Sequence, residues 1–244
     1  MVESLYDLYP PAFSKLIGHF YDNKVDKSIH IKELNCIYIP IPKVGTKSIK
    51  KVFADYLHSE NSDKRFDTTY SNKKQLPFHR VPKSSLDSLK NNNFIFSFVR
   101  NPYDRILSCY FDKINKKTSY IGFLRYQGRF YRGMSFEDFI EEIATIPDSD
   151  ADQHFRSQFK FLVNENDELI PHFVGQLENM SADFKTVIKE LSTDKLELTH
   201  LNRSKARKID YSEYFTPKIT ELIQERYEKD FQLFGYSTEI EHYV

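Results

Sequence analysis

A short stretch of the chain, PKVGTKS, combines residue types that bind anions. Lys43 and Lys47 supply positive charge, Thr46 and Ser48 supply hydroxyl groups, and Gly45 allows the backbone to approach a ligand closely. An apolar run precedes the stretch and apolar residues at helical spacing follow it, so it joins a buried strand to a helix. Because a helix N-terminus presents backbone N–H groups and positive dipole charge, we predict that this loop binds phosphate or sulfate.

A second junction of strand and helix occurs in FVRNPYDRILSCY. The apolar strand at 94–99 ends at Arg100, and the Asn-Pro pair that follows suits the start of a helix. Ligands of open α/β sheets bind beyond the carboxyl ends of the strands, so we expect Arg100 to share a crevice with Lys43. Ser108 is expected to turn its hydroxyl toward the same ligand, and Arg105 is expected to form a surface ion pair.

The length and composition of the chain favour one folded domain over 1–244. Its 244 residues, 40% of them hydrophobic, are enough to bury a sizeable core. We expect an α/β fold with a mainly parallel central sheet flanked by helices and a P-loop-like turn at the anion site. The 35 basic and 35 acidic residues cancel, which argues against a nucleic-acid-binding or membrane-surface protein.

The cysteines and the apolar runs bear on the cellular compartment. Cys36 and Cys109 are too few for a disulfide framework, which fits a reducing environment. No signal peptide or membrane-spanning run is visible, so we expect a soluble, cytoplasmic protein. No convincing cluster of histidine and carboxylate side chains suggests a metal site.

Two segments stand apart from the strand and helix pattern of the rest of the domain. Residues 1–33 are expected to form an N-terminal helical extension that ends in a charged connector over 22–33. Residues 113–133 form an insertion in which basic and aromatic residues alternate. This composition suits an acceptor-facing surface and a plain solvated surface about equally.

Further elements follow from local signals. A third apolar strand is predicted at 173–177, with Glu178 at its end and a helix after it. Capped helix starts are predicted near Ser84, Ser135 and Thr216, from their hydroxyl groups and the residues that follow. These strands and helices complete the α/β domain that is expected to surround the predicted anion-binding loop at 42–48.

Several motifs, in this order, resemble the Golgi-type carbohydrate sulfotransferases and their soluble bacterial relatives, which use 3′-phosphoadenosine 5′-phosphosulfate (PAPS). IPKVGTKSIK resembles the loop that holds the 5′-phosphosulfate of the donor, and FVRNPYDRILSCY resembles the element that holds its 3′-phosphate. DQHFRSQFKFL resembles an acceptor-side segment, and HFVGQLENMSADF resembles the third strand and helix. The resemblance covers roughly residues 36–236.

The resemblance implies roles for individual residues. The contacts to the 5′ end of the donor would be Lys43, Gly45, Thr46, Lys47 and Ser48. Arg100 and Ser108 would contact the 3′-phosphate. Lys43 would also neutralise the charge that grows on the bridging oxygen as the product, 3′-phosphoadenosine 5′-phosphate (PAP), leaves.

The general base is the least defined part of this prediction. On the residues alone, His79 suits a structural role unless it faces the anion loop, whereas the resemblance implies that it removes the proton of an acceptor hydroxyl. His154 and Glu178 are alternatives for the same step. His154, Arg156 and Glu178 are also weaker candidates for binding the acceptor, which the resemblance implies is a carbohydrate.

Two other functions use an anion-binding loop. A P-loop kinase or nucleotide hydrolase would need the pattern Gly-x-x-x-x-Gly-Lys-Ser/Thr, which is not met because Thr46 separates Gly45 from Lys47. A non-catalytic module that binds sulfated or phosphorylated ligands would have the loop without turnover. The sequence leaves both alternatives open.

Overall fold

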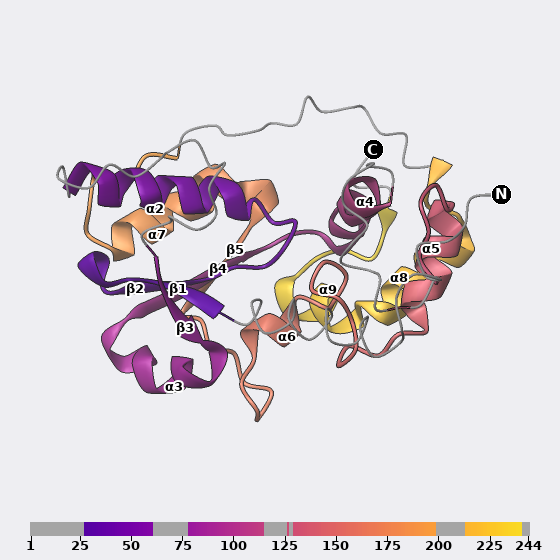
Figure 1. Cartoon of the computed structure of the whole chain (residues 1–244), viewed down its shortest axis with the longest axis horizontal. Coiled ribbons are helices and arrows are strands. Elements are labelled where there is room, and N and C mark those ends of the chain that lie inside the picture. Colours follow the sequence, from indigo (N-terminus) through magenta and orange to yellow (C-terminus); the bar gives the residue numbers. More distant parts are fainter. Residues whose placement is uncertain (1–26, 61–77, 115–125, 127–128, 199–212, 241–244) are drawn as a thin grey trace, which may run out of the picture. The chain divides into compact units, whose positions relative to one another are not determined.

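The computed structural model describes residues 27–60, 78–114, 126, 129–198 and 213–240 (Figure 1). The chain divides into two compact units. The sheet unit comprises Lys27–Arg100 and Phe161–Lys208, and the helical unit comprises Met1–Asp26, Asn101–Lys160 and Ile209–Val244. The chain therefore crosses from the sheet unit to the helical unit directly after Arg100.

The sheet unit is built on a five-stranded sheet with the order β3-β1-β2-β4-β5. Its strands are β1 (Lys27–Ile31), β2 (Cys36–Ile39), β3 (His79–Pro82), β4 (Phe94–Val99) and β5 (Phe173–Gln176). The central pair β2 and β4 and the pair β4 and β5 are parallel, whereas β1 is antiparallel to both of its neighbours. The mixed α/β fold with parallel central strands confirms the predicted fold class.

Helices cover both faces of this sheet. On one face lie α2 (Thr46–Glu60) and α7 (Met180–Glu190), and on the other lies the short α3 (Leu86–Leu89) (Figure 1). Aromatic rings join the first pair of helices to the sheet: Phe53 of α2 lies 5.9 Å from Phe96, and Phe184 of α7 lies 6.4 Å from Phe98. These contacts help to bury β4 from Ile95 to Val99 under the helices that follow two of the parallel strands.

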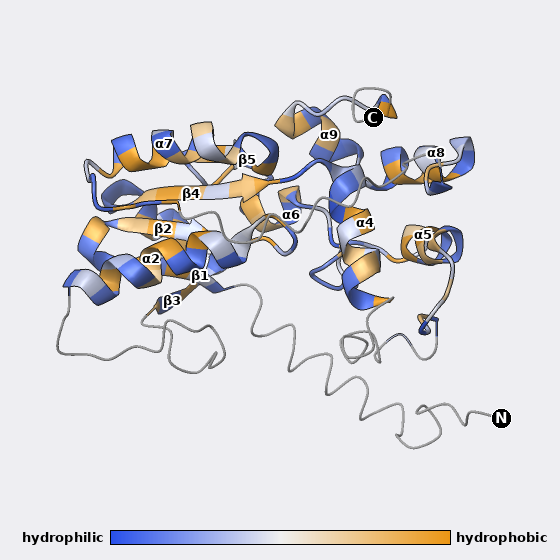
Figure 2. Ribbon diagram, turned by 90° about the horizontal axis from the view of Figure 1, so that it is seen from above, coloured by the Kyte–Doolittle hydropathy of each residue, from blue (hydrophilic) through white to orange (hydrophobic). Residues whose placement is uncertain are grey.

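The parallel strands are apolar because both of their faces are covered. Figure 2 shows β2 and β4 as largely hydrophobic ribbons, and every residue of β2 is buried. The buried Ser97 in β4 is the polar exception, and its hydroxyl donates to the Ile39 carbonyl at 2.7 Å. This bond links the two strands close to the end where each enters a loop.

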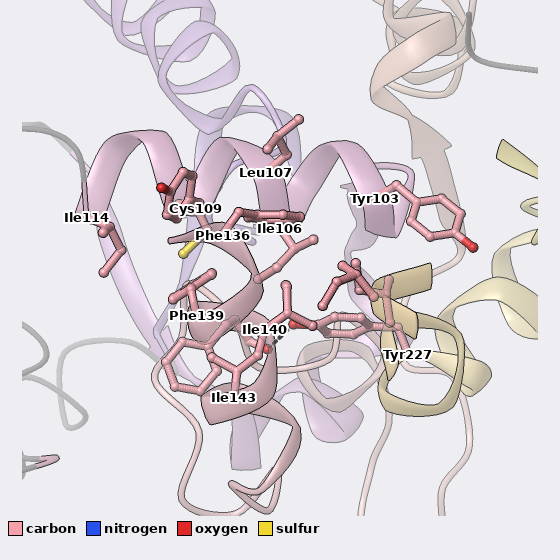
Figure 3. Packing of buried hydrophobic residues seen from close by; sticks show 14 of the residues in the cluster. Tyr103, Ile106, Leu107, Cys109, Ile114, Phe136, Phe139, Ile140, Ile143 and Tyr227 are labelled. Carbon is pink, nitrogen blue, oxygen red and sulfur yellow. Dashed lines mark hydrogen bonds between the residues drawn. The ribbon is translucent and has the colours of Figure 1, made fainter. Parts of the chain in front are cut away.

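The helical unit packs its helices around a separate aromatic core. In its described residues it contains the helices α4 (Pro102–Lys113), α5 (Phe136–Ala144), α8 (Pro217–Arg226) and α9 (Glu228–Phe234). Figure 3 shows α4 and α5 contributing facing side chains to this core, among them Ile106, Phe139 and Ile140. Beside α3, the described residues of both units contain the short helical segments η2 (Lys32–Leu34), η3 (Lys83–Ser85), η4 (Lys90–Asn92), α6 (Phe159–Leu162) and η6 (Leu177–Asn179).

Most predicted elements occur where local signals placed them. The strands at 94–99 and 173–176 are present, and Asn101, Ser135 and Thr216 each accept a backbone N–H bond at a helix start. The helix near Ser84 is also present as η3 and α3, but Ser85 makes no side-chain capping bond there. Sequence reasoning missed two strands, because 27–31 was expected to belong to a charged connector and 79–82 was not predicted to pair.

Parts of two predicted segments lie outside the described residues. The helical part of the predicted extension 1–33 is among them, as is most of the insertion 113–133. Within the described part of that insertion, Tyr126 and Phe130 are buried in the aromatic core rather than presented to a ligand. No helix of the described chain is long and apolar enough to cross a membrane.

Candidate active site

The anion loop, residues 40–45, leaves the carboxyl end of β2 and enters α2. Two of its residues have left-handed backbone angles: φ is 72° at Lys43 and 74° at Gly45. This conformation is natural for glycine but costs a residue such as lysine about 1–2 kcal/mol. Strain of this kind is retained mainly where a site requires it, so the conformation of Lys43 marks the loop as a ligand-binding candidate.

The loop is closed by hydrogen bonds from its own helix. The Thr46 hydroxyl donates to the Ile41 carbonyl at 2.5 Å and lies 3.3 Å from the Tyr38 hydroxyl, which donates to it. Ser48 donates its backbone N–H to the Gly45 carbonyl at 2.9 Å. Thr46 therefore uses its hydroxyl to shape the loop, so the contribution it retains toward an anion is its backbone N–H at the start of the helix.

Gly45 lies against the turn that follows β5. A Cβ atom added there would lie 2.9 Å from Leu177 Cδ1 and 3.1 Å from Met180 Cε. The anion loop thus packs on the segment that contains Glu178, and Glu178 itself is exposed. Within the sheet unit, Glu178 is the predicted base whose neighbours in sequence, Leu177 and Met180, lie against the anion loop.

Arg100 occupies the equivalent position after the neighbouring parallel strand. Ile39 of β2 is level with Ser97 of β4, so Arg100 lies as far beyond Ser97 as Pro42 lies beyond Ile39. On the other side, Val99 is level with Gln176, the last residue of β5. The anion loop and Arg100 therefore sit at the carboxyl ends of adjacent parallel strands, and a ligand with two anionic groups suits this edge. That they share one crevice stays a prediction.

Ser108 belongs to the helical unit, on α4. That helix starts as predicted, with Pro102 in its first turn and the Asn101 side chain accepting from the Tyr103 N–H at 2.9 Å. Ser108 is partly exposed, as is Asp104 one turn earlier, whereas most of the helix is buried. The hydroxyl is thus on the accessible side of α4, and its predicted role with the 3′-phosphate stays a prediction.

His79 is the first residue of β3, and the sheet register separates it from the anion loop. It pairs with His30, which in turn pairs with Ile37, near the amino end of β2. Because Tyr38 shares the α2 face with Phe96, its neighbour Ile37 points to the opposite face, and so do the two histidines. The structure therefore does not bring His79 to the strand ends where the loop begins.

His154 and Arg156 lie in residues 148–159 of the helical unit, which overlap the predicted acceptor-side segment at 152–162 and are called the acceptor segment below. His154 Nδ1 lies 2.6 Å from Asp152 Oδ1, and the same oxygen accepts the backbone N–H of His154 at 2.9 Å. The Arg156 guanidinium donates to the Ala151 carbonyl, with its Nη2 at 2.9 Å. Both predicted side chains therefore have local structural partners.

Two buried charged residues that hold this segment were not predicted. Arg105 is only 2% exposed, and its guanidinium donates to the carbonyls of Gln153 and Arg156 at 3.1 and 2.8 Å. Asp230 is fully buried and accepts from two backbone N–H groups of the segment. The expected surface ion pair of Arg105 is wrong, because its partners are main-chain carbonyls that lie about fifty residues away in the sequence.

A signal for both residues was present in the helical spacing. Arg105 stands four residues before Cys109, and Asp230 stands between Tyr227 and Phe234 at the spacing of the apolar face. A charged residue on an apolar face is unusual unless it has a partner. Such a position predicts a buried polar contact, although the partner cannot be read from the helix itself.

Comparison with known proteins bears on the chemistry of these elements. A sequence model described as "Sulfotransferase family" matches residues 28–237. The search of curated proteins and the search of solved structures gave no match. The matched range begins in β1 and ends after α9, so it includes the anion loop, Arg100 and the acceptor segment.

Proposed function

The chain belongs to the sulfotransferase family. We propose that it moves the sulfuryl group of PAPS to a hydroxyl group of an acceptor, and that this acceptor is a carbohydrate, as the motif resemblance implies. One observation carries the proposal: a strained, lysine-bearing loop and an arginine follow adjacent parallel strands of the same sheet. PAPS has two separated anionic ends, which matches two cationic positions. The family membership supplies the reaction type, and the residues supply the assignment.

The anion loop holds the 5′-phosphosulfate in this proposal. Gly45, Thr46 and Lys47 bring backbone N–H groups to the start of α2, where the helix dipole favours an anion. Ser48 and the Lys47 side chain add a hydroxyl group and a positive charge. The hydrogen bond of Thr46 to Ile41 keeps the loop in one shape, so little ordering is required when the donor binds.

Lys43 acts on the breaking bond. As the acceptor oxygen approaches sulfur, the bond between sulfur and the bridging oxygen lengthens and negative charge builds on the departing phosphate. An ammonium group held at this position stabilises that charge more in the transition state than in the bound donor. Lys43 therefore contributes to turnover more than to donor affinity.

Arg100 and Ser108 select the donor by its 3′-phosphate. A guanidinium group can bind two phosphate oxygens at once, and such charge-assisted bonds are about twice as strong as neutral ones. Nucleotides that lack the 3′-phosphate lose this contact. This arrangement separates PAPS from ATP, which a kinase with a similar loop would use.

A transfer assay tests the proposal. Purified protein is incubated with PAPS carrying ³⁵S and a panel of neutral and anionic oligosaccharides, and PAP binding is measured by calorimetry. Label transfer to a saccharide together with PAP binding supports the proposal. Transfer of phosphate from ATP would favour a kinase, and PAP binding without transfer to any tested hydroxyl would favour a non-catalytic binding module.

A further inference from the structure

The turn that joins β5 to α7, residues 176–180, lies against the anion loop and is called the β5 turn below. The helices that follow the two segments, α2 and α7, cover the same face of the sheet (Figure 1). Apart from chain neighbours, the atoms nearest to the Cβ position of Gly45 are Leu177 Cδ1 at 2.9 Å and Met180 Cε at 3.1 Å. Two side chains of the β5 turn therefore contact the backbone of the anion loop, which cannot move toward them unless they give way.

The β5 turn is itself held by β4 and α7. In the first turn of α7, Asp183 Oδ2 accepts the Gln176 N–H at 2.6 Å, which joins the end of β5 to the helix. Gly175, the residue before, packs so closely that an added Cβ would lie 2.5 Å from Phe98 Cε1 and 3.0 Å from Asp183 Cβ. The strand and the helix thus fix the point at which the β5 turn begins.

Backbone strain in the anion loop makes this support significant. Lys43 keeps a left-handed φ of 72°, and strain of this kind persists only where the surrounding structure over-determines it. Within the loop, the Thr46 hydroxyl binds the Ile41 carbonyl and so joins residues on either side of Lys43. The β5 turn adds a contact from outside the loop, at Gly45. An internal hydrogen bond and an external contact therefore both restrict the backbone around Lys43.

We propose that Leu177 and Met180 are positioning residues, which keep the anion loop in the left-handed conformation that the donor requires, and that Asp183 keeps the β5 turn in place for them. The inference rests on the proposed function, and it goes beyond the donor contacts because neither side chain touches PAPS in this role. If the support is lost, the loop relaxes toward backbone angles that suit a lysine. PAPS then binds only the fraction of molecules that keep the strained loop, and the apparent affinity falls by that fraction.

A positioning role and an ordinary packing role make different predictions. Leu177 and Met180 are both half-buried, so truncating either one lowers the free energy of unfolding whatever its role. Positioning adds a dependence on the residue at position 43, because only a residue that is strained in the left-handed region has to be held there. Glycine populates both signs of φ about equally, so a glycine at position 43 makes the support nearly unnecessary.

The decisive experiment is a double-mutant cycle between Leu177→Ala and Lys43→Gly, with PAP affinity measured by calorimetry. We expect Leu177→Ala to weaken PAP binding by about 5- to 30-fold, the population cost of a left-handed lysine. In the Lys43→Gly background, the same substitution should change PAP affinity by no more than about twofold. Leu177→Met, which conserves the volume of the side chain, should stay within about threefold of wild type.

Two further variants complete the design. Asp183→Ala removes the bond to Gln176 and should weaken PAP binding by at least about threefold, again only when position 43 is lysine. Leu169→Ala is the matched control, because Leu169 is an exposed leucine of the sheet unit and should leave PAP affinity unchanged in both backgrounds. Circular dichroism establishes that each variant is folded, and Leu177→Val takes the place of Leu177→Ala in the cycle if the alanine variant does not fold.

The outcomes separate this inference from the function on which it rests. Equal losses of PAP affinity in the lysine and glycine backgrounds, or a folded Leu177→Ala protein that binds PAP as wild type does, overturn the positioning role alone. Wild-type protein that binds no PAP overturns the proposed function, and the positioning role with it. PAP binding without transfer from PAPS overturns the proposed transfer reaction, while the cycle still decides the positioning role.

Discussion

Gly45 and Leu177 are so close that a methyl group on Gly45 would lie 2.9 Å from Leu177 Cδ1. The contact ties the anion loop to the turn after β5, two elements that follow non-adjacent strands of the sheet. Any side chain at this position must also adopt the left-handed φ of 74°. A substitution of Gly45 is therefore unfavourable for two independent reasons, the contact with Leu177 and the backbone angle.

The first prediction concerns Gly45→Ala. We expect it to lower the free energy of unfolding by about 1–2 kcal/mol from the backbone alone, and to weaken PAP binding because Leu177 and Met180 must move. Gly133→Ala is the matched control, since Gly133 has φ of 80° but no neighbouring atom within 4 Å of an added Cβ. Urea denaturation and calorimetry measure both effects. Equal PAP affinity in the two variants would remove the anion loop from the donor site.

The second prediction separates strain from chemistry at Lys43. Lys43→Gly removes the ammonium group but suits the left-handed backbone, so we expect unchanged or higher stability, by up to about 1 kcal/mol, relative to wild type. Turnover should fall by about 10²- to 10³-fold in both Lys43→Gly and Lys43→Ala, with a smaller loss of PAP affinity. Wild-type kcat in either variant would exclude Lys43 from the reaction.

The anion loop and β4 could be predicted because their signals are local. A continuous apolar run, a glycine at a left-handed position and an Asn-Pro helix start are all read within a few neighbouring residues. The family resemblance rested on the same local motifs. The strand ends and helix starts on both sides of the predicted site could therefore be located before their neighbours in space were known.

The edge strands and the buried contacts of Arg105 and Asp230 could not be predicted in the same way. β1 contains Lys27, Ser28 and His30, so its sequence looks like a connector, and pairing with β2 and β3 is what makes it a strand. Likewise, the partners of Arg105 are carbonyl groups that only the tertiary fold brings within reach. Long-range pairing of this kind leaves no local pattern.

The third prediction tests recognition of the 3′-phosphate. Arg100→Ala should weaken binding of PAP by about 10- to 100-fold while leaving the affinity for 5′-AMP, which lacks the 3′-phosphate, nearly unchanged. Arg129→Ala is the control, because Arg129 is exposed and pairs with Glu142 in the helical unit. If the ratio of the affinities for PAP and 5′-AMP is the same in Arg100→Ala as in wild type, another residue binds the 3′-phosphate.

The fourth prediction follows from the position of His79. Because the register places it near the amino end of β2 and on the face opposite α2, His79→Gln should keep kcat within about threefold of wild type. The measurement is the initial rate of label transfer over a range of pH, beside His154→Ala. A loss of 10²-fold or more in folded His79→Gln would instead support the base that the sequence resemblance implied.

The fifth prediction concerns how the contribution of Asp230 to the free energy of unfolding depends on pH. Burial raises the pKa of the Asp230 carboxyl group from 3.8 to about 6, although hydrogen bonds from Gln158 and Phe159 oppose the change. Between these values the native protein binds more protons at this site than the unfolded chain does. The stability contributed by Asp230 is therefore present at low pH and is lost as pH rises toward 6.

Asp230→Asn removes this dependence, so its effect should vary with pH. At pH 7 we expect the free energy of unfolding to fall by about 1–3 kcal/mol. Each carboxylate oxygen accepts one backbone N–H, and the amide nitrogen that replaces one oxygen cannot accept. At pH 4 the loss should be greater by about 2 kcal/mol, since wild type then gains the stabilising proton and the variant does not. Urea denaturation at both pH values, with Asp138→Asn as the control, measures the difference. If the free energy of unfolding falls equally or less at pH 4, the Asp230 carboxyl group holds the acceptor segment without a raised pKa.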